Sequence, residues 1–285
     1  MTPPADRTPV IRCRGVVKRF GGRAVLDGVN LDIYAGETMV VMGGSGSGKS
    51  TLLRVIVGAI KPDEGSVEVL GTDIARASGA ELDQVRKRFG ILFQSGALFN
   101  SMSLAENIGL ILDEHTDLAP EIVDIQVKIK LELVGLLQAA QRFPAEISGG
   151  MKKRAGLARA LALDPEILFY DEPSAGLDPV TSAQIDQLIV DLSGKLGVTS
   201  VVVTHEMDSA FTIADRMCML DRGTMLAVEP RAWYDALRKT GPADAEQLAP
   251  HEKLIRQFLR GDAEGPLTQR AQSGLYEREL LGLEE

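Results

Sequence analysis

Cysteine is scarce in this sequence, and its two copies are far apart. Cys13 and Cys218 belong to no Cys-x-x-Cys pair and have no histidine companion. Metal-binding and redox sites are built from clusters of such residues, so neither kind of site has support here. We therefore predict that both cysteines are small residues of the hydrophobic core.

Long apolar stretches are missing as well. No run of 18 apolar residues occurs, which is about the shortest length that suits a membrane-spanning helix. The first residues also lack the charged segment followed by an apolar segment that marks a secretory signal. We expect the protein to stay in the cytoplasm and to contact a membrane only through partners.

The sequence has no excess of positive charge. Its 31 lysines and arginines stand against 40 aspartates and glutamates, which gives a net charge of −9. Proteins that bind along a nucleic-acid backbone carry a broad basic surface instead, so we predict no nucleic-acid partner. With 285 residues, 45% of them hydrophobic, the chain is long enough for one domain with a subdomain or an appendage.

A glycine-rich stretch is the strongest motif that the sequence contains. Gly43, Gly48, Lys49 and Ser50 fill the pattern G-x-x-x-x-G-K-[ST], between an apolar run and residues of helical spacing. The backbone N–H groups of such a loop, and the helix start after it, bind phosphate oxygens. Lys49 would reach the β- and γ-phosphates and the Ser50 hydroxyl would hold Mg²⁺. The loop alone does not distinguish a kinase from a GTPase or a transport ATPase. The residues predicted to bind nucleotide here are Gly43, Gly44, Ser45, Gly46, Ser47, Gly48, Lys49, Ser50 and Thr51.

Polar side chains stand at the ends of three segments that have the apolar pattern of buried strands. These are Gln94, the pair Asp171 and Glu172, and His205. Open α/β sheets bind ligands beyond the carboxyl ends of their strands, so we expect all four residues on one rim. Adjacent residues of a strand point to opposite sides, which would direct one carboxylate to Mg²⁺ and the other to a water beside the γ-phosphate. By pattern alone, Gln94 fits a solvated loop equally well, and His205 could merely bond to the backbone.

Before the glycine loop, residues 10–17 and 24–33 have the pattern of a β-hairpin. Phe20 lies at its turn, where it would either pack against apolar neighbours or stack on an adenine ring. After residue 95 the pattern becomes helical, with Ser103 as N-cap and Glu106 at the capping-box position. A second helix is expected at 120–137. Its apolar stripe would consist of Ile122, Ile125, Ile129, Leu133 and Leu136/Leu137.

A second potential anion site lies at the sequence Ser148-Gly149-Gly150. Ser148 is a suitable N-cap, and glycines at a helix start expose backbone N–H groups. Seen alone, the same residues favour a helix with an unusually flexible entry over an anion site.

In chain order, these motifs resemble those of the ATP-binding cassette (ABC) transporter ATPase family over about residues 10–230. The Walker A loop, Q-loop, signature, Walker B, D-loop and switch histidine follow one another in the family's order. They are residues 43–50, Gln94, 148–150, 167–171 with Glu172, 174–178 and His205.

The resemblance implies an α/β fold of the P-loop NTPase type. It would combine a RecA-like mixed sheet core with an antiparallel β subdomain and an α-helical subdomain. The expected division is an N-terminal tail (1–9), a nucleotide-binding core (10–94 and 160–230), a helical subdomain with the signature (95–159) and a C-terminal extension (231–285).

The resemblance also implies an ATPase that works as a head-to-tail dimer with ATP and Mg²⁺. Each ATP would lie between the Walker A loop of one subunit and Ser148, Gly149 and Gly150 of the second copy. Phe20 would stack on the adenine, and Asp178 would couple the two sites across the dimer.

The catalytic roles of the family carry over to the matching residues. Glu172 would act as base or position the attacking water, and His205 would contact the γ-phosphate. Lys49 and Gln94 would complete the catalytic group. The Mg²⁺ ligands would be Ser50, Gln94 and, through water, Asp171.

One signature position departs from the family's usual Leu-Ser-Gly-Gly-Gln. Met151 replaces the glutamine and cannot make its polar contacts. A methionine at this position, followed by basic residues, resembles the signature of the branch that powers lipid transporters of the Mla/Mce type. Residues 95–107 are also similar to that branch. In the family, this segment forms the groove that receives the permease's coupling helix.

That branch implies a subunit that drives phospholipid transport and maintains outer-membrane lipid asymmetry. Its partners would be a second copy, a membrane permease subunit, an Mce-domain protein and a small STAS-domain subunit, at the cytoplasmic face of the inner membrane. The alternatives are an ABC importer ATPase for a polar solute and a non-transport ABC ATPase that acts on nucleic acid.

The last part of the chain extends beyond a minimal cassette. Leu254, Ile255, Phe258 and Leu259 form an apolar stripe in a predicted helix at 251–260. Two arrangements fit this stripe: an ordinary terminal helix packed on its own domain, or the extension of Mla-type ATPases that reaches over the partner subunit.

Overall fold

A six-stranded mixed sheet forms the centre of the molecule. The structure, a computed structural model, describes residues 8–269, so most of the N-terminal tail and the end of the C-terminal extension lie outside it. The strand order is β10 (Thr224–Pro230), β9 (Arg216–Asp221), β3 (Thr38–Met42), β8 (Thr199–Val203), β7 (Ile167–Asp171) and β6 (Phe89–Leu92). Neighbouring strands are parallel except for β9 and β10.

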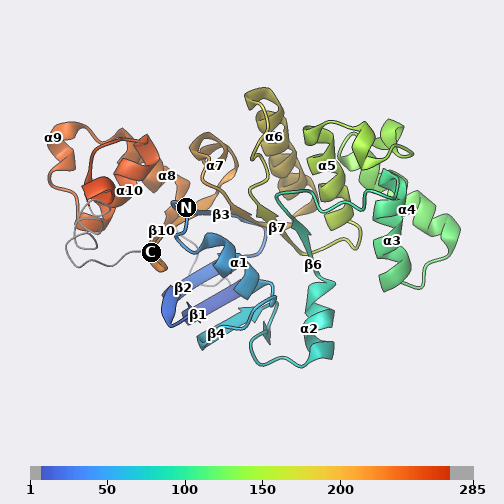
Figure 1. Cartoon of the computed structure of the whole chain (residues 1–285), viewed down its shortest axis with the longest axis horizontal. Helices are drawn as coiled ribbons and strands as arrows, with labels where there is room; N and C mark the ends of the chain where they lie inside the picture. The colour runs from blue at the N-terminus through green and yellow to red at the C-terminus, as the bar shows by residue number, and fades with distance from the viewer. Residues whose placement is uncertain (1–7, 270–285) are drawn as a thin grey trace.

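A smaller antiparallel sheet lies beside this one. Its order is β2 (Arg23–Tyr34), β1 (Pro9–Phe20), β4 (Glu64–Val69) and β5 (Thr72–Asp73). The predicted hairpin is therefore confirmed, with strands longer than the sequence pattern indicated. Helix α1 (Lys49–Ile56) lies between the two sheets and buries Leu52, Val55 and Ile56 (Figure 1).

Most of the other helices cover the opposite face of the large sheet or extend beyond its ends, whereas α2 (Gly79–Arg86) buries Val85 on the same side as α1. Figure 1 shows α3 (Leu104–His115) and α4 (Pro120–Leu133) at one end of the molecule and the C-terminal helices at the other. The remaining helices before residue 214 are α5 (Gly149–Ala160), α6 (Pro179–Leu196) and α7 (Met207–Ile213), with short 3-10 turns at Leu137–Ala139 and Pro144–Glu146.

The large sheet separates two hydrophobic cores. Met39 and Val41 of β3 belong to the core shared with α1 and the antiparallel sheet. Val40 and Met42 belong to the core on the helical side. Cys13 and Cys218 are both fully buried in the first core, as predicted.

The predicted stripe of the second helix is wrong for its first three residues. Ile122, Ile125 and Ile129 are between 43% and 50% exposed, whereas Val127 and Leu131 are buried. The helix ends at Leu133 and not at 137, and Leu136 beyond it is buried in the core. The cap of α3 is as predicted, because Ser103 and Glu106 form a reciprocal capping box.

The C-terminal helices pack on the chain's own domain. They are α8 (Arg231–Lys239), α9 (Pro242–Ala245) and α10 (Pro250–Arg260). Tyr234, Leu237, Ile255 and Leu259 belong to the same core as the helical side of the large sheet. Of the two arrangements that fit the α10 stripe, the structure has the one packed on the same chain.

Candidate active site

Four neighbouring strands bring the predicted residues to one edge of the large sheet. β3, β8, β7 and β6 run parallel, so their carboxyl ends lie side by side. The glycine loop follows β3, His205 follows β8, Asp171 and Glu172 stand at the end of β7, and Gln94 follows β6. The expectation of one shared rim is confirmed.

Close packing requires two glycines of the loop. Gly43 has φ +151° and Gly48 has φ +109°, a region that favours glycine. A Cβ atom at Gly43 would lie 2.2 Å from the carbonyl oxygen of Leu220, and one at Gly48 would lie 2.7 Å from that of Val25. The loop is therefore pressed against strands β9 and β2, and neither position has room for a side chain.

Lys49 points back into its own loop. Its Nζ donates hydrogen bonds to the carbonyl oxygens of Gly43, at 2.7 Å, and Gly44, at 3.0 Å. Burial lowers the pKa of the Lys49 ammonium, and the charges of Glu172 and Asp171 act in the opposite direction. The ammonium is thus bonded within its own loop, and the charges of the two carboxylates act on it from the end of β7.

Asp171 is half-buried at the end of β7. Burial raises the pKa of its carboxyl, the neighbouring charge of Glu172 raises it further, and Arg54, Lys153 and Lys49 lower it. A carboxylate in this position has three cations near it, which suits a site for a charged ligand.

The backbone conformation of Glu172 differs from the extended strand conformation that the alternation of side chains assumes. Its φ is +50°, a left-handed conformation that is uncommon for residues other than glycine. Its backbone N–H still donates to the carbonyl oxygen of Val203, at 2.9 Å. The orientation of its side chain is therefore set by a left-handed turn and not by the pleat of β7.

The carboxylate of Glu172 is held by the end of β8. Its Oε2 accepts a hydrogen bond from the Thr204 hydroxyl at 3.2 Å, and its Oε1 lies 2.8 Å from Nδ1 of His205. The His205 side chain is 60% exposed, whereas that of Glu172 is 14% exposed. The imidazole thus contacts the buried carboxylate on one side and solvent on the other, and such a contact is suited to orienting the carboxylate toward a ligand.

Sequence reasoning missed Lys153, which lies in α5 beyond the signature. Its side chain is buried, with a residue exposure of 6%, and its Nζ donates to the carbonyl oxygen of Glu172 at 3.0 Å. The run of basic residues after Met151 was a visible signal, but a charge run on a helix usually faces solvent. Nothing in the pattern indicated which of these side chains is buried.

The start of α5 is formed as the motif predicted, with an added packing constraint. The Ser148 side chain caps the helix by accepting from the N–H of Met151 at 3.3 Å. A Cβ atom at Gly150 would lie 2.4 Å from Cγ2 of Thr181 in α6. Asp178 caps α6 in turn, because its carboxylate accepts hydrogen bonds from the N–H groups of Val180 and Thr181.

Three other predicted residues are exposed. Phe20 is 51% exposed at the β1–β2 turn, with the Lys18 ammonium 5.5 Å from the centre of its ring. Gln94 is exposed beyond β6, and Ser50 is exposed in the first turn of α1. All three have side chains that a ligand can reach.

Comparison with known proteins decides the family. The model of the ABC transporter family matches residues 26–175. The chain is also 42% identical, over 95% of its own length and 96% of the other's, to the intermembrane phospholipid transport system ATP-binding protein MlaF of Escherichia coli strain K12. The chain belongs to the ABC transporter family. Its recognition by motif order is therefore confirmed, and the rim described above is that of an ABC ATPase.

Other relatives and solved structures agree with this membership. The chain is 45% identical, over 90% of its length and 70% of the other's, to the probable ribonucleotide transport ATP-binding protein mkl of Mycobacterium leprae. It superposes with a TM-score of 0.71, at 32% identity, on a dimeric ATP-binding cassette, MJ0796, bound to ADP and phosphate, covering 78% of this chain and 98% of that one. The P-loop ABC ATPase fold, with its mixed sheet, β subdomain and helical subdomain, is likewise confirmed.

The loop of this ABC ATPase fits the phosphates of ATP. The Ser47 hydroxyl is buried and lacks a hydrogen-bond partner, while a Cβ atom at Gly44 or Gly46 would meet nothing within 4 Å. Buried polar groups are normally satisfied, so the orphaned hydroxyl and the open space beside these glycines suit a ligand rich in acceptor oxygens. ATP is the nucleotide of the family.

The oxygen donors beside the loop suit Mg²⁺. Ser50, Asp171 and Gln94 offer hydroxyl, carboxylate and amide oxygens, which hard cations prefer. In the part of the chain that the structure describes, no cluster of three or more His, Cys, Asp or Glu side chains would hold a metal ion. Mg²⁺ usually takes one or two protein ligands and completes its shell with phosphate oxygens and water.

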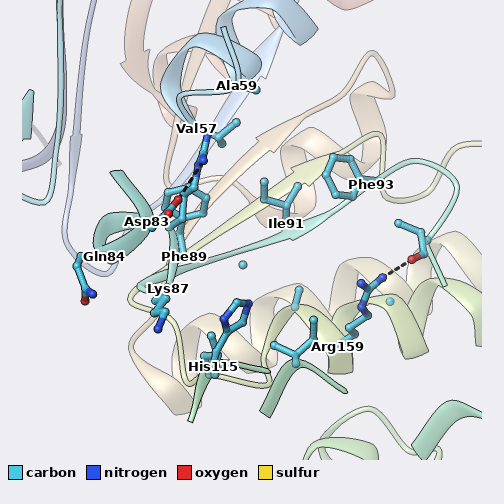
Figure 2. Close-up of a pocket in the computed structure, with 18 of the residues that line it drawn as sticks. Val57, Ala59, Asp83, Gln84, Lys87, Phe89, Ile91, Phe93, His115 and Arg159 are labelled. Carbon is cyan, nitrogen blue, oxygen red and sulfur yellow. Dashed lines mark hydrogen bonds and ion pairs between the residues drawn. The ribbon is translucent and has the colours of Figure 1, made fainter. Parts of the chain in front are cut away.

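A large groove lies next to the rim, on the far side of β6. Its volume is about 800 Å³, and its walls come from α2 and β6 on one side and from α3 and α5 on the other. Figure 2 shows Phe89, Ile91 and Phe93 along one wall, with His115 and Arg159 facing them. Arg159 also donates to the carbonyl oxygen of Ala97 and lies over the ring of Phe99, so α5 holds the segment that follows Gln94.

Among residues 8–269, the helices are too short or too polar for any of them to cross a membrane.

Proposed function

We propose that this ABC ATPase drives phospholipid transport and thereby maintains outer-membrane lipid asymmetry. The similarity to MlaF carries the proposal, because it extends over nearly the whole of both chains and includes the C-terminal helices. Met151 in the signature and residues 95–107 after the Q-loop support the same branch.

The hydrolytic role is assigned to Glu172 on the basis of its contacts. Held by Thr204 and His205, its carboxylate accepts a proton from the attacking water or orients that water. Lys49 binds the β- and γ-phosphates once it exchanges its bonds to the loop carbonyls for phosphate oxygens, and His205 contacts the γ-phosphate. Ser50 and Gln94, with Asp171 acting through a water, would hold Mg²⁺, and the ion would neutralise charge on the phosphates.

The site is completed by a second copy of the chain. In the proposed head-to-tail dimer, the capped start of α5 in one subunit binds the ATP that lies in the loop of the other. Ser148 and the N–H groups of Gly149 and Gly150 supply donors at a helix N-terminus. Phe20 stacks on the adenine, and Asp178 couples the two sites.

The groove beside β6 receives the membrane permease subunit in this proposal. Phe93 is 48% exposed and Phe99 45% exposed beside it, and protein interfaces often bury such aromatic side chains at their centre. The further partners are an Mce-domain protein and a small STAS-domain subunit. The complex works at the cytoplasmic face of the inner membrane, to which this chain binds as a peripheral subunit.

Transport of phospholipid is tested with the whole complex. The tagged full-length chain is purified from membranes with its companions and reconstituted in vesicles that contain a fluorescent phospholipid. We expect ATP-dependent transfer of the lipid to or from acceptor vesicles, and none with the complex that carries Glu172→Gln. A complex that moves no lipid in either direction contradicts the proposal.

A ribonucleotide or other polar solute is the second candidate cargo. It is favoured by the 45% identity to mkl, whose name refers to ribonucleotide transport. Adding ribonucleotides to the same reconstituted complex distinguishes the two, because stimulation of ATP hydrolysis by ribonucleotide and not by phospholipid favours this second candidate.

The role of Glu172 is tested by Glu172→Gln. The amide cannot accept a proton, so we expect the rate of ATP hydrolysis to fall about 10²-fold to 10⁴-fold while ATP binding persists. Sedimentation with ATP should then detect a long-lived dimer. Glu132→Gln, at an exposed position of α4, is the matched control and should hydrolyse ATP at close to the normal rate. Normal turnover by Glu172→Gln refutes the assignment.

A further inference from the structure

Glu172 is fixed from two directions by different parts of the chain. The end of β8 holds its N–H and its carboxylate through Val203, Thr204 and His205. Its carbonyl oxygen is held instead by Lys153 of α5, at 3.0 Å. In a left-handed residue the backbone conformation persists only where its surroundings impose it, so each of these contacts helps to define where the carboxylate points.

The position of Lys153 in its helix is the second observation. The residue lies five positions after Ser148, which places it about 7.5 Å further along α5, at 1.5 Å per residue. Three residues beyond it, Gly156 packs so closely on the carbonyl oxygen of Gly96 that a Cβ atom would lie 2.7 Å away. One helix therefore begins at the signature, contacts Glu172 in its middle and packs on the segment after Gln94.

The charges around Lys153 suit a residue that serves this site. Burial lowers the pKa of the Lys153 ammonium, and the charges of Asp171, Glu172 and Glu206 raise it. A buried ammonium costs free energy unless it is hydrogen-bonded, so the bond to the carbonyl oxygen of Glu172 holds the side chain in place. Lys152, the preceding residue, is only half-buried.

We propose that Lys153 is a positioning residue for Glu172, through which the signature helix sets the backbone turn that aims the catalytic carboxylate. The proposal rests on the proposed role of Glu172 and of the dimer. In that dimer, α5 binds the ATP of the partner's loop at its first turn and holds the glutamate of its own subunit at its second. When α5 moves as it binds the ATP in the partner's loop, the movement is thereby transmitted to Glu172, which acts on the ATP in its own subunit's loop.

The test compares Lys153→Met, Lys153→Gln and Lys153→Arg in the full-length chain, with Lys152→Gln as the control. We expect Lys153→Met to lower kcat for ATP hydrolysis about 10-fold to 100-fold, since small displacements of a catalytic group have effects of this size. KM and the affinity for a fluorescent ATP analogue should change less than about twofold. Lys153→Arg should recover at least a third of the activity, and Lys152→Gln should be normal.

A double variant separates positioning from a general loss of structure. In the background of Glu172→Gln, Lys153→Met should lower the residual rate no further, because a residue that acts through Glu172 has nothing left to position. A further loss as large as in the normal background overturns the proposal, as does a Lys153→Met variant with normal kcat. If Glu172→Gln alone turns over normally, the role of Glu172 fails instead, and the two failures are thus distinguishable.

Should Lys153→Met fold poorly, Lys153→Gln replaces it. The glutamine amide retains a donor for the carbonyl oxygen of Glu172 but lacks the charge and the length. An intermediate kcat with unchanged ATP affinity supports positioning through the carbonyl. A loss of ATP affinity equal to the loss of kcat overturns it.

Discussion

At the scale of single residues, Gly150 shows how a motif glycine serves packing as well as ligand binding. The missing side chain lets the first turn of α5 contact Thr181 of α6, which itself donates a hydrogen bond to Asp178 at 2.5 Å. The sequence pattern suggested exposed N–H groups at this position. The contact with α6 adds a steric reason that only the fold reveals.

This contact predicts that Gly150→Ala is destabilising and that Thr181→Ser rescues it. The new Cβ atom would overlap the Thr181 methyl group, at a cost of about 1–3 kcal/mol that outweighs the gain of about 1 kcal/mol in helix propensity. Serine removes that methyl group and keeps the hydroxyl. Urea unfolding and ATPase assays of both single variants and the double variant check this; a stable Gly150→Ala variant, or no rescue, contradicts it.

Glu172 and Lys153 mark the limit of sequence reasoning about the site. The order of the motifs was enough to place Lys49, Asp171 and His205 on one rim, because strand ends in a parallel sheet converge. The left-handed conformation of Glu172 was not predictable, since no glycine or turn pattern marks it. The burial of Lys153 depends on how α5 packs against β6 and reaches the residue that follows β7, which no local pattern specifies.

At the scale of secondary-structure elements, α4 explains why an apolar stripe was assigned to the wrong face. The helix has apolar residues at helical spacing on two faces, so periodicity alone could not choose between them. The fold decides the matter by packing α4 against α3, where Val123 and Val127 lie next to Gly109. The strands and caps were predicted better, since their signals are local: alternation, a serine cap, and a glutamate three residues later.

The orientation of α4 predicts opposite effects for two substitutions of apolar residues. Leu131 is fully buried, so Leu131→Ala should lower the free energy of unfolding by about 2–5 kcal/mol. Ile125 is 50% exposed, so Ile125→Ser should change it by less than about 1 kcal/mol. Denaturant unfolding of the isolated chain measures both, and equal losses would mean that the Ile125 face is buried.

At the scale of the whole molecule, the C-terminal helices belong to the fold of the domain. Ile255 and Leu259 of α10 lie in the core that also contains Tyr234 and Leu237 of α8. A truncation meant to test contacts with a partner must therefore spare α10. Contact of the C-terminal extension with a partner subunit stays a prediction, and residues 270–285 of that extension lie outside the described part of the chain.

Two truncations separate folding from assembly. A chain that ends before Leu254 should melt several degrees lower than the full-length protein, because it loses buried apolar surface from the core. A chain that ends at Gln269 should melt normally but assemble less well into the dimer or the transporter complex. Thermal unfolding and complex yield measure these effects, and normal assembly of the second truncation would exclude a role for residues 270–285.

Strand β3 has a consequence for how the chain can vary. Four of its five residues alternate between the two cores, with Met39 and Val41 on one side and Val40 and Met42 on the other. Inserting or deleting a single residue there would exchange the two sets and turn the loop at Gly43 toward the wrong face. The number of residues between the start of β3 and the nucleotide loop therefore cannot change by even one. Insertions and deletions should accumulate elsewhere in the chain.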